Sequence, residues 1–133
     1  MLEKLLQKLS GELEIIEAPI KNELGVFLVK LTDQLQIQVK ELDPGISFYT
    51  TLEPLPIINR EEAVIYLMEA NFLAQGTGGS VISLDDHEKF LTLSLVLPYD
   101  MNYKTFKDEL EEFANYADYW KEELIRLSTP QLG

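Results

Sequence analysis

Residues 34–41 read QLQIQVKE, a strict alternation of polar and apolar side chains. In an extended chain Leu35, Ile37 and Val39 all point to one face, and the glutamines between them point to the other. A sheet that buries one face and leaves the other in water is commonly antiparallel. This stretch therefore predicts a strand of an antiparallel sheet with one apolar and one polar face.

Two further runs flank this strand. Residues 25–31 (GVFLVKL) and 46–52 (ISFYTTL) are rich in β-branched and aromatic residues, which favour strands. The segments between the runs contain Thr32-Asp33 and Asp43-Pro44-Gly45, which are residues typical of turns. Short turns between strand-like runs predict antiparallel neighbours, so we expect a three-stranded meander.

A second pair of strands is expected nearer the C-terminus. Residues 80–84 and 90–97 are again rich in strand-forming residues, and the polar residues 85–89 between them predict a hairpin turn. Pro98 ends the second run, because proline cannot donate a ladder hydrogen bond. The sequence thus predicts five strands.

Three segments carry apolar residues at the spacing of a helix. They are residues 1–9, with Gly11 expected to end the helix; about 60–75, with Asn59 as N-cap; and about 102–127, with a continuous apolar stripe. The resulting order, α-β-β-β-α-β-β-α, predicts an α+β fold in which helices pack on a twisted antiparallel sheet. We expect one domain over residues 1–128 and a disordered tail over residues 129–133.

The composition excludes several functional classes. The 133 residues include 23 acidic and 11 basic ones, a formal net charge of −12, whereas a protein that binds nucleic acid or anionic membrane needs a basic face. The absence of cysteine excludes disulfides, a thiol nucleophile and cysteine-based zinc sites. No run approaches the ~18 apolar residues of a membrane span, so no membrane insertion is expected. These features predict a cytoplasmic protein.

No arrangement of residues predicts catalysis, a metal site or a cofactor. His87 is the sole histidine and lies in the polar turn at 85–89, where a solvated loop residue is expected. That turn lacks the spacing and the central glycine of a calcium loop. The glycine-rich residues 75–79 follow a helix, whereas phosphate-binding loops lead into a helix N-terminus. We therefore expect a protein that is not an enzyme and uses no metal or cofactor.

The first two helices present apolar surface that needs a partner. The first helix has leucines on one side, and a helix of nine residues is not stable alone. These leucines either dock on the chain's own core or help to line a groove for an extended partner segment. The second helix is apolar around most of its circumference, which predicts either deeper burial within the chain or contact with a second subunit.

Several short motifs occur in order along the chain and together resemble those of a known family. They are residues 55–56 (LP), 60–62 (REE), 67–72 (LMEANF), 75–79 (QGTGG), 97–100 (LPYD) and 113–120 (FANYADYW). This series resembles the Tir-chaperone family, the class I chaperones of bacterial type III secretion. The resemblance covers about residues 1–127 and is most specific in residues 67–79 and in the last helix.

The resemblance implies a cytosolic bacterial homodimer without ATPase activity. Such chaperones bind an N-proximal segment of a secreted effector or translocator and keep it soluble and competent for export by the secretion apparatus. The alternative is a regulatory adaptor of the same fold that binds a transcription factor or a component of the secretion gate. The long entry over residues 11–24 departs from the family pattern, and residues 12–16 are a candidate extra strand.

The resemblance also assigns surfaces to residues. In the family, the second helix and the strand after it commonly build the dimer interface, whereas the first helix and exposed sheet surfaces form the effector groove. The residues expected at the dimer interface are Val64, Leu67, Met68, Asn71, Val81 and Ile82. The residues expected to contact the effector are Leu2, Leu5, Leu6, Leu9, Val26, Leu28, Leu35 and Ile37.

Overall fold

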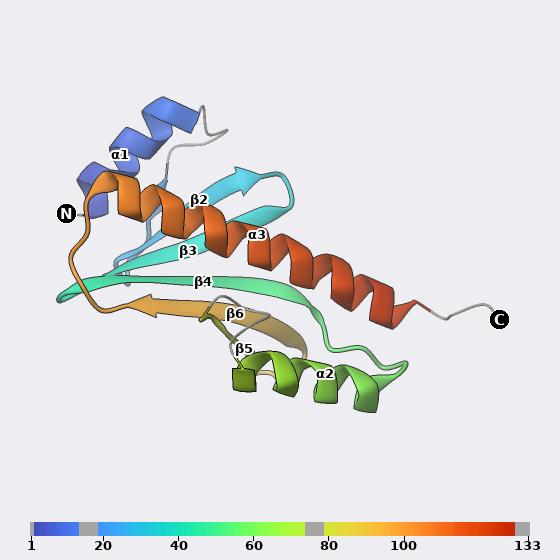
Figure 1. The fold of residues 1–133 in the computed structure, drawn as a ribbon. Coiled ribbons are helices and arrows are strands. Elements are labelled where there is room, and N and C mark those ends of the chain that lie inside the picture. The colour runs from blue at the N-terminus through green and yellow to red at the C-terminus, as the bar shows by residue number, and fades with distance from the viewer. Residues whose placement is uncertain (1, 14–18, 74–78, 130–133) are drawn as a thin grey trace.

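A computed structural model describes residues 2–13, 19–73 and 79–129 of the chain. The elements are α1 (Leu2–Leu13), β1 (Ile20–Lys21), β2 (Val26–Thr32), β3 (Leu35–Leu42), β4 (Gly45–Pro54), α2 (Arg60–Leu73), β5 (Val81–Leu84), β6 (Phe90–Leu97) and α3 (Tyr103–Ser128). Figure 1 shows α3 lying across one face of the sheet, with α1 beside the first turns of α3 and α2 next to β5.

The strands form one six-stranded sheet in the order β1-β2-β3-β4-β6-β5, and each neighbouring pair is antiparallel. β4 lies at the centre, where it pairs with β3 on one side and with β6 on the other. The meander β2-β3-β4 and the hairpin β5-β6 are those expected from the sequence. The predicted α+β fold, an antiparallel sheet with packed helices, is therefore confirmed.

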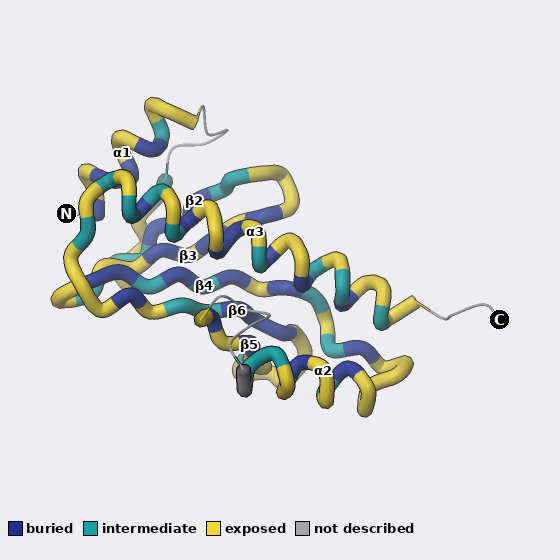
Figure 2. The backbone as a smooth tube through the Cα atoms, in the orientation of Figure 1, coloured by how far each residue is buried: buried dark blue, intermediate teal, exposed yellow. Residues whose placement is uncertain are grey.

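The core lies between α3 and one face of the sheet. Along β3 the apolar residues Leu35, Ile37 and Val39 are buried, and Gln36 and Gln38 are exposed, which confirms the two predicted faces. Figure 2 shows this alternation of buried and exposed residues along the strands that α3 covers. The sheet thus has a core face under α3 and an open face of mixed polar and apolar residues.

An aromatic cluster joins α3 to the central strand. The ring centroid of Phe48 in β4 lies 5.4 Å from that of Phe113 and 6.1 Å from that of Phe106, both in α3. Trp120, farther along α3, is 1% exposed. Large aromatic side chains contribute most of the buried area in such a core, and tilted ring pairs add to their stabilisation. This cluster fixes α3 over the middle of the sheet.

α1 is longer than the sequence predicted. It runs through Gly11 to Leu13, so the expectation that Gly11 ends the helix is wrong. The last turn is held in place because the Glu12 carboxylate contacts α3, a contact that local sequence does not reveal. Glu12 is helical and belongs to no extra strand, while residues 14–16 lie outside the described residues. An extra strand does form later, as the two-residue β1.

α2 begins at Arg60, as the sequence predicted, but its predicted C-terminal end at about residue 75 lies outside the described residues. Asn59, the expected N-cap, directly precedes α2, and its backbone carbonyl accepts the N–H of Ala63 at 2.9 Å. The glycine-rich segment begins in the range 74–78, which is outside the described residues, as are residues 130–133 of the expected tail. A single domain ending at residue 128 stays a prediction.

Gly45 occupies a turn that no other residue fits. It begins β4 with φ +110°, a backbone conformation that favours glycine. A Cβ atom at this position would overlap the carbonyl oxygen of Leu97 and lie 2.9 Å from Cα of Pro98. Both obstacles are backbone, so a side chain cannot be accommodated by a rotamer change. The close approach of β4 to the end of β6 therefore depends on Gly45.

We predict that Gly45→Ala lowers the free energy of unfolding by roughly 3 kcal/mol, because it adds backbone strain to a steric clash. Urea denaturation measures the change. Gly11→Ala is the matched control, since nothing lies within 4 Å of its Cβ position and alanine favours the helix. That variant should be as stable as the original chain or up to about 1 kcal/mol more stable. Equal midpoints for the two variants would contradict this account.

Candidate functional site

A hollow separates α1 from the first strands. It has a volume of about 280 Å³ and is lined by Glu3, Leu6, Gln7, Ser10, Pro19 and Phe27. The Ser10 hydroxyl oxygen is buried and has no hydrogen-bond partner among the described residues. A buried hydroxyl without a partner is unfavourable, and a bound group that supplies one would remove that cost. The hollow is therefore mainly apolar with one unused polar group.

The four leucines of α1 face the chain's own core. Leu2, Leu5, Leu6 and Leu9 are all buried and belong to the same cluster as the sheet and α3. Of the two alternatives left by the sequence, docking on the core is the arrangement present in the single chain. Leu6 also contributes to the wall of the hollow. Contact between these leucines and an effector stays a prediction.

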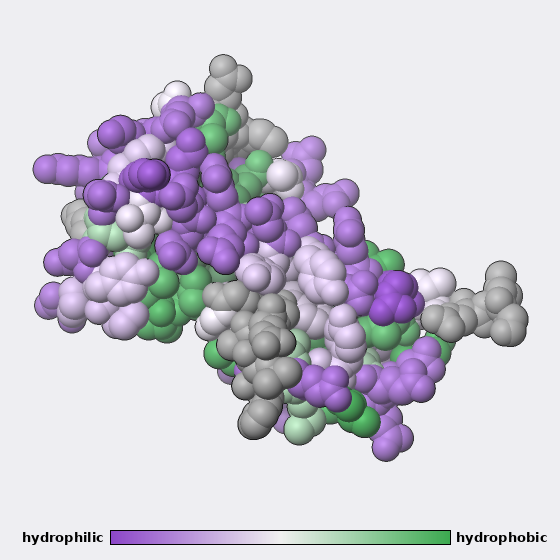
Figure 3. Space-filling view, in the orientation of Figure 1, coloured by the Kyte–Doolittle hydropathy of each residue, from purple (hydrophilic) through white to green (hydrophobic). Residues whose placement is uncertain are grey.

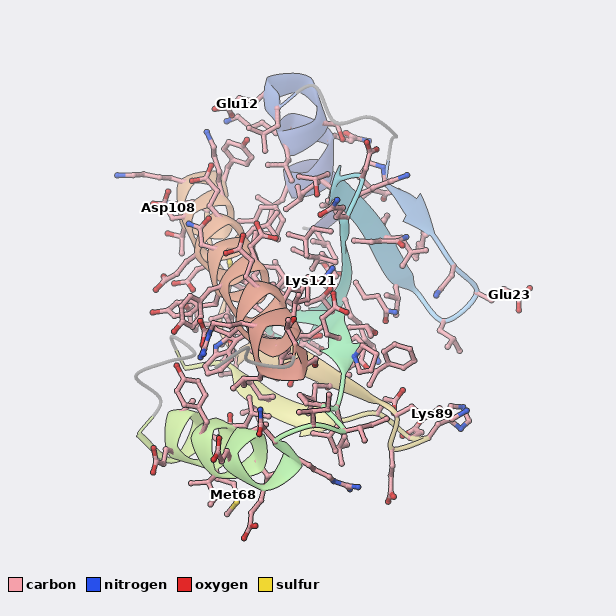
Figure 4. The ribbon with its side chains drawn as sticks, turned by 90° about the vertical axis from the view of Figure 1, so that its right-hand side faces the viewer. Glu12, Glu23, Met68, Lys89, Asp108 and Lys121 are labelled. Atoms are coloured by element: carbon pink, nitrogen blue, oxygen red, sulfur yellow. The ribbon has the colours of Figure 1, made fainter. Side chains whose placement is uncertain are left out.

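Two carboxylates fasten α1 at its two ends. The backbone N–H of Leu2 donates to Oε1 of Glu41 at 2.8 Å, which ties the helix N-terminus to β3. At the other end the Glu12 carboxylate accepts from the Tyr103 hydroxyl at 2.6 Å and from Lys107 Nζ at 2.7 Å (Figure 4). The hydrogen bonds from Lys107 and Tyr103 lower the pKa of Glu12, and that from Leu2 lowers the pKa of Glu41.

A second hollow is lined by residues of β2, β3, β4 and α3. It has a volume of about 370 Å³ and is lined by Leu28, Gln34, Gln36, Gln38, Thr50, Thr51 and Lys121. Val26 and Leu28 of β2 are half-buried on the open face of the sheet, because they pair with Lys40 and Gln38 of β3. These two of the predicted effector contacts therefore lie at the surface.

Leu35 and Ile37 lie on the opposite face. Both are buried in the core that α3 covers, since each is one residue out of step with the exposed glutamines of β3. The alternation in residues 34–41 predicted the two faces of the strand correctly, and the family resemblance implied effector contacts on the apolar face. The exposed residues of β3 in the single chain are Gln36, Gln38, Lys40 and Glu41. An effector contact at Leu35 and Ile37 stays a prediction.

An acidic cavity opens between the β2–β3 turn and the C-terminal half of α3. It has a volume of about 770 Å³ and is lined by Thr32, Asp33, Gln34, Glu53, Asp118, Lys121, Glu122 and Ile125. Lys121, labelled in Figure 4, donates from Nζ to the backbone carbonyl of Gln34 at 2.5 Å. Gln34 and Lys121 line both this cavity and the second hollow. The two depressions therefore adjoin.

α2 divides the predicted dimer residues into a buried and an exposed set. Leu67 and Ile82 are each 5% exposed and pack inside the chain, and Val64 is half-buried. Met68 and Val81 are 64% and 53% exposed. In Figure 4 the labelled Met68 lies on the side of α2 that points away from the sheet. The structure thus explains why α2 is apolar on most sides: one side packs inside the chain, and another side is exposed to solvent.

Aromatic contacts hold α2 against α3. The Tyr66 ring lies 5.3 Å from that of Trp120, and the hydroxyl oxygens of Tyr66 and Tyr119 are 3.2 Å apart. This hydrogen bond and partial burial raise the pKa of Tyr66 to about 12. In the space-filling view of Figure 3, hydrophobic residues are visible around this end of the molecule, while hydrophilic residues dominate the side of α1 and the start of α3.

Asn71, the remaining residue predicted at the dimer interface, makes contacts within the chain. Its side-chain Nδ2 donates to the backbone carbonyl of Ile82 at 2.7 Å, and the Ile82 N–H donates to its Oδ1 at 2.8 Å. Sequence reasoning missed this pairing, because it joins an α2 side chain to the backbone of β5. The helical pattern of α2 shows that Asn71 interrupts an apolar face, and that interruption is the only local signal.

The polar turn at residues 85–89, whose sequence predicted no metal site, has a structural role. Asp85 opens the β5–β6 turn, and its Oδ1 accepts the N–H groups of Lys89 and Phe90. The described ranges contain no group of three or more His, Cys, Asp or Glu residues placed to hold a metal ion. Nor does any helix in these ranges have the length and apolar character needed to cross a membrane.

Comparison with known proteins gives a family and a set of similar folds. The model of the Tir chaperone protein (CesT) family matches residues 4–121. No curated protein sequence matches the chain. Among the 14 matching chains of solved structures, one comes from the HopA1–SchA chaperone–effector complex: it is 16% identical, with a TM-score of 0.69 over 91% of this chain and 93% of that one.

A second similar structure is the Yersinia pestis type III secretion chaperone SycH in complex with a stable fragment of YscM2. The matching chain is also 16% identical, and the alignment covers 96% of this chain and 100% of that one with a TM-score of 0.59. At this level of identity the two structures show that the fold is shared.

We predict that α1 loosens in acid before the core unfolds. The pKa values of Glu12 and Glu41 are lowered from 4.5 in the folded chain, so their contribution to stability is full above that pH and is lost as pH falls through the lowered values. Amide hydrogen exchange, compared between pH 7 and pH 3.5, should show α1 losing protection while β4 keeps it.

Glu12→Gln is the diagnostic variant, since glutamine cannot ionise and should give α1 the weaker attachment at both pH values. Glu23→Gln is the control, because Glu23 extends into solvent from the β1–β2 turn (Figure 4). If Glu12→Gln leaves the pH response of α1 as intact as Glu23→Gln does, the Glu12 carboxylate does not fasten this helix.

Proposed function

The chain belongs to the Tir chaperone protein (CesT) family, and we propose on that premise that it is a type III secretion chaperone that binds an N-proximal segment of a secreted effector or translocator. The observation that carries the proposal is the family match over residues 4–121, most of the chain. The fold shared with chains of a chaperone–effector complex supports it. We further propose that it acts in the bacterial cytoplasm, without enzymatic activity or a cofactor, and passes its client to the secretion apparatus.

The physical task of such a chaperone is to cover an unfolded segment. A polypeptide that must stay unfolded before export exposes apolar side chains and unpaired backbone groups, and both promote aggregation. A carrier protects them by offering apolar depressions for the side chains and a strand edge for the backbone. The surfaces described above supply features of each kind without a metal, a nucleotide or a reactive side chain.

The hollow beside α1 suits an apolar side chain of the client. Leu6, Pro19 and Phe27 give it apolar walls, and it is also lined by Ser10, whose buried hydroxyl has no hydrogen-bond partner among the described residues. A client backbone carbonyl that accepts a hydrogen bond from Ser10 would satisfy that group as its neighbouring side chain enters the hollow. We therefore place the first effector contact here rather than on the buried side of α1.

The edge of the sheet next to this hollow suits backbone pairing. β1 is only two residues long, and its described part pairs with Phe27 and Leu28 of the seven-residue β2. A client strand added along the rest of β2, residues 29–32, would extend the sheet next to β1. The edge then leads past Thr32 to the acidic cavity, where basic client residues would find carboxylates.

We also propose that the chain forms a homodimer through the open side of α2 and β5. Ile65, Met68 and Val81 are each more than half exposed, and α2 and β5 are packed together. Covering such apolar side chains with a second copy removes them from water, the main driving force for association. Two copies would present two effector surfaces, so that one long segment gains effective concentration from its second contact.

We predict that co-expression with a tagged N-proximal segment of a secreted protein encoded beside the chain makes that segment soluble, and that the two co-purify. Gln7→Trp should abolish this capture, because Gln7 is an exposed residue on the rim of the hollow and an indole there would fill it. Capture is measured as the amount of chain retained on the tagged segment.

Lys4→Trp is the matched control for this experiment. Lys4 is an exposed residue of the same helix and does not line the hollow. Lys4→Trp therefore adds an indole to α1 outside the hollow. It should keep full capture. Failure of every neighbouring secreted protein to co-purify with the unaltered chain would overturn the proposed function, and equal capture by the two tryptophan variants would remove the hollow from the binding surface.

We predict that Met68→Glu shifts the mass measured by light scattering from two chains to one chain of 15.2 kDa, while the circular dichroism spectrum stays unchanged. A charge at this exposed position would be buried unpaired in the dimer. Leu24→Glu, at a position 82% exposed in the β1–β2 turn, is the control and should remain a dimer. Leu67→Glu should instead unfold the chain, because Leu67 is buried. A two-chain mass for Met68→Glu would place the interface elsewhere.

A further inference from the structure

At one edge of the sheet the side chain of Asn71 bonds to the backbone of the last strand, β5. β5 is the last strand on one side, and its neighbour β6 pairs with it in the register Ile82–Leu93. The N–H and the C=O of one strand residue point to the same side of the strand. Because both groups of Ile82 bond to the Asn71 side chain, they point away from β6 and toward the outer edge.

The Asn71 side chain occupies the position that an added strand would need. A primary amide offers one acceptor and donors in the same arrangement as a peptide group, so Asn71 completes one rung of a β-ladder on β5. β5 is four residues long, and outward-pointing backbone pairs recur at every second residue. The Ile82 rung is therefore central to any ladder that could form on this edge.

The closing side chain is held by the packing of its helix. Ala63 and Leu67 bury one side of α2 within the chain, and the contacts of Tyr66 with Tyr119 and Trp120 fasten the same helix to α3. α2 is thus fixed in the position from which Asn71 reaches the β5 edge. At the other end of the sheet β1 pairs with Phe27 and Leu28 of β2, and Asn22 bonds to both backbone groups of Val26. No described strand pairs with residues 29–32 of β2 on that side.

We propose that Asn71 closes the β5 edge against strand addition and so directs a partner strand to the β2 edge alone. The identity of that partner strand as a client segment rests on the proposed function, whereas the closure of β5 is a property of the chain by itself. An exposed strand edge pairs readily with other chains, and proteins protect such edges with covering elements or charges. Here a neutral amide gives the protection by satisfying the edge.

The test compares two variants that break the same rung. Asn71→Ala removes both hydrogen bonds and leaves Ile82 free to pair with a β5 edge of another copy. Asn71→Asp loses the donor to the Ile82 carbonyl and places a charge on the edge, which opposes pairing with a second strand. If Asn71 served only to anchor α2, the two variants would associate alike.

The expected result at pH 7 is a mass for Asn71→Ala, by analytical ultracentrifugation, that rises with concentration above that of the unaltered chain, and an unchanged mass for Asn71→Asp. Hydrogen exchange at the Ile82 amide should be faster in Asn71→Ala by roughly fivefold or more, the effect of one net hydrogen bond. Equal masses for both variants and the unaltered chain would overturn the proposal.

A measurement on the unaltered chain keeps the proposal testable even if both variants fail to fold. The Ile82 amide should exchange more slowly than that of Leu84, which shares its outward direction but has no bond to Asn71. Equal exchange at the two amides would overturn the closure. None of these readouts includes a client, so a failure of the proposed chaperone function leaves them unchanged, and their failure leaves client capture unchanged.

Discussion

The packing of α3 on one face of the sheet is the interaction on which the rest of the structure depends. The apolar side of α3 carries Phe106, Phe113 and Trp120 and packs over Phe48 and its neighbours. This packing buries the core face of the sheet. A partner can therefore reach the open face, the two sheet edges, the outer sides of the helices and the acidic cavity beside α3.

These remaining surfaces are not equivalent. The β2 edge adjoins the hollow beside α1 and the acidic cavity, so apolar, backbone and charged features follow one another along one path. The β5 edge is occupied by the Asn71 amide and is flanked by the exposed Met68 and Val81. The arrangement separates a side suited to an extended client from a side suited to a second copy of the chain.

Sequence patterns predicted the parts of the fold that depend on local periodicity. The alternation in residues 34–41 gave the strand and its two faces, and the stripe of α3 gave the long helix. What the patterns missed depends on contacts between distant residues. α1 continues through Gly11 because Glu12 meets Tyr103 and Lys107, and the Asn71 side chain bonds to the backbone of β5.

The candidate binding residues were harder to predict for the same reason. Apolar character marked Leu35, Ile37 and Leu67 equally with Val26, Leu28 and Met68, but only the three-dimensional packing decides which of them are buried.

The central claim, that the chain carries an unfolded client segment along the β2 edge, is tested most directly by hydrogen exchange on the chain with and without that segment. The account predicts slower exchange in α1 and residues 19–32 and no change in β5. Slower exchange in β5 with none in residues 19–32 would contradict it.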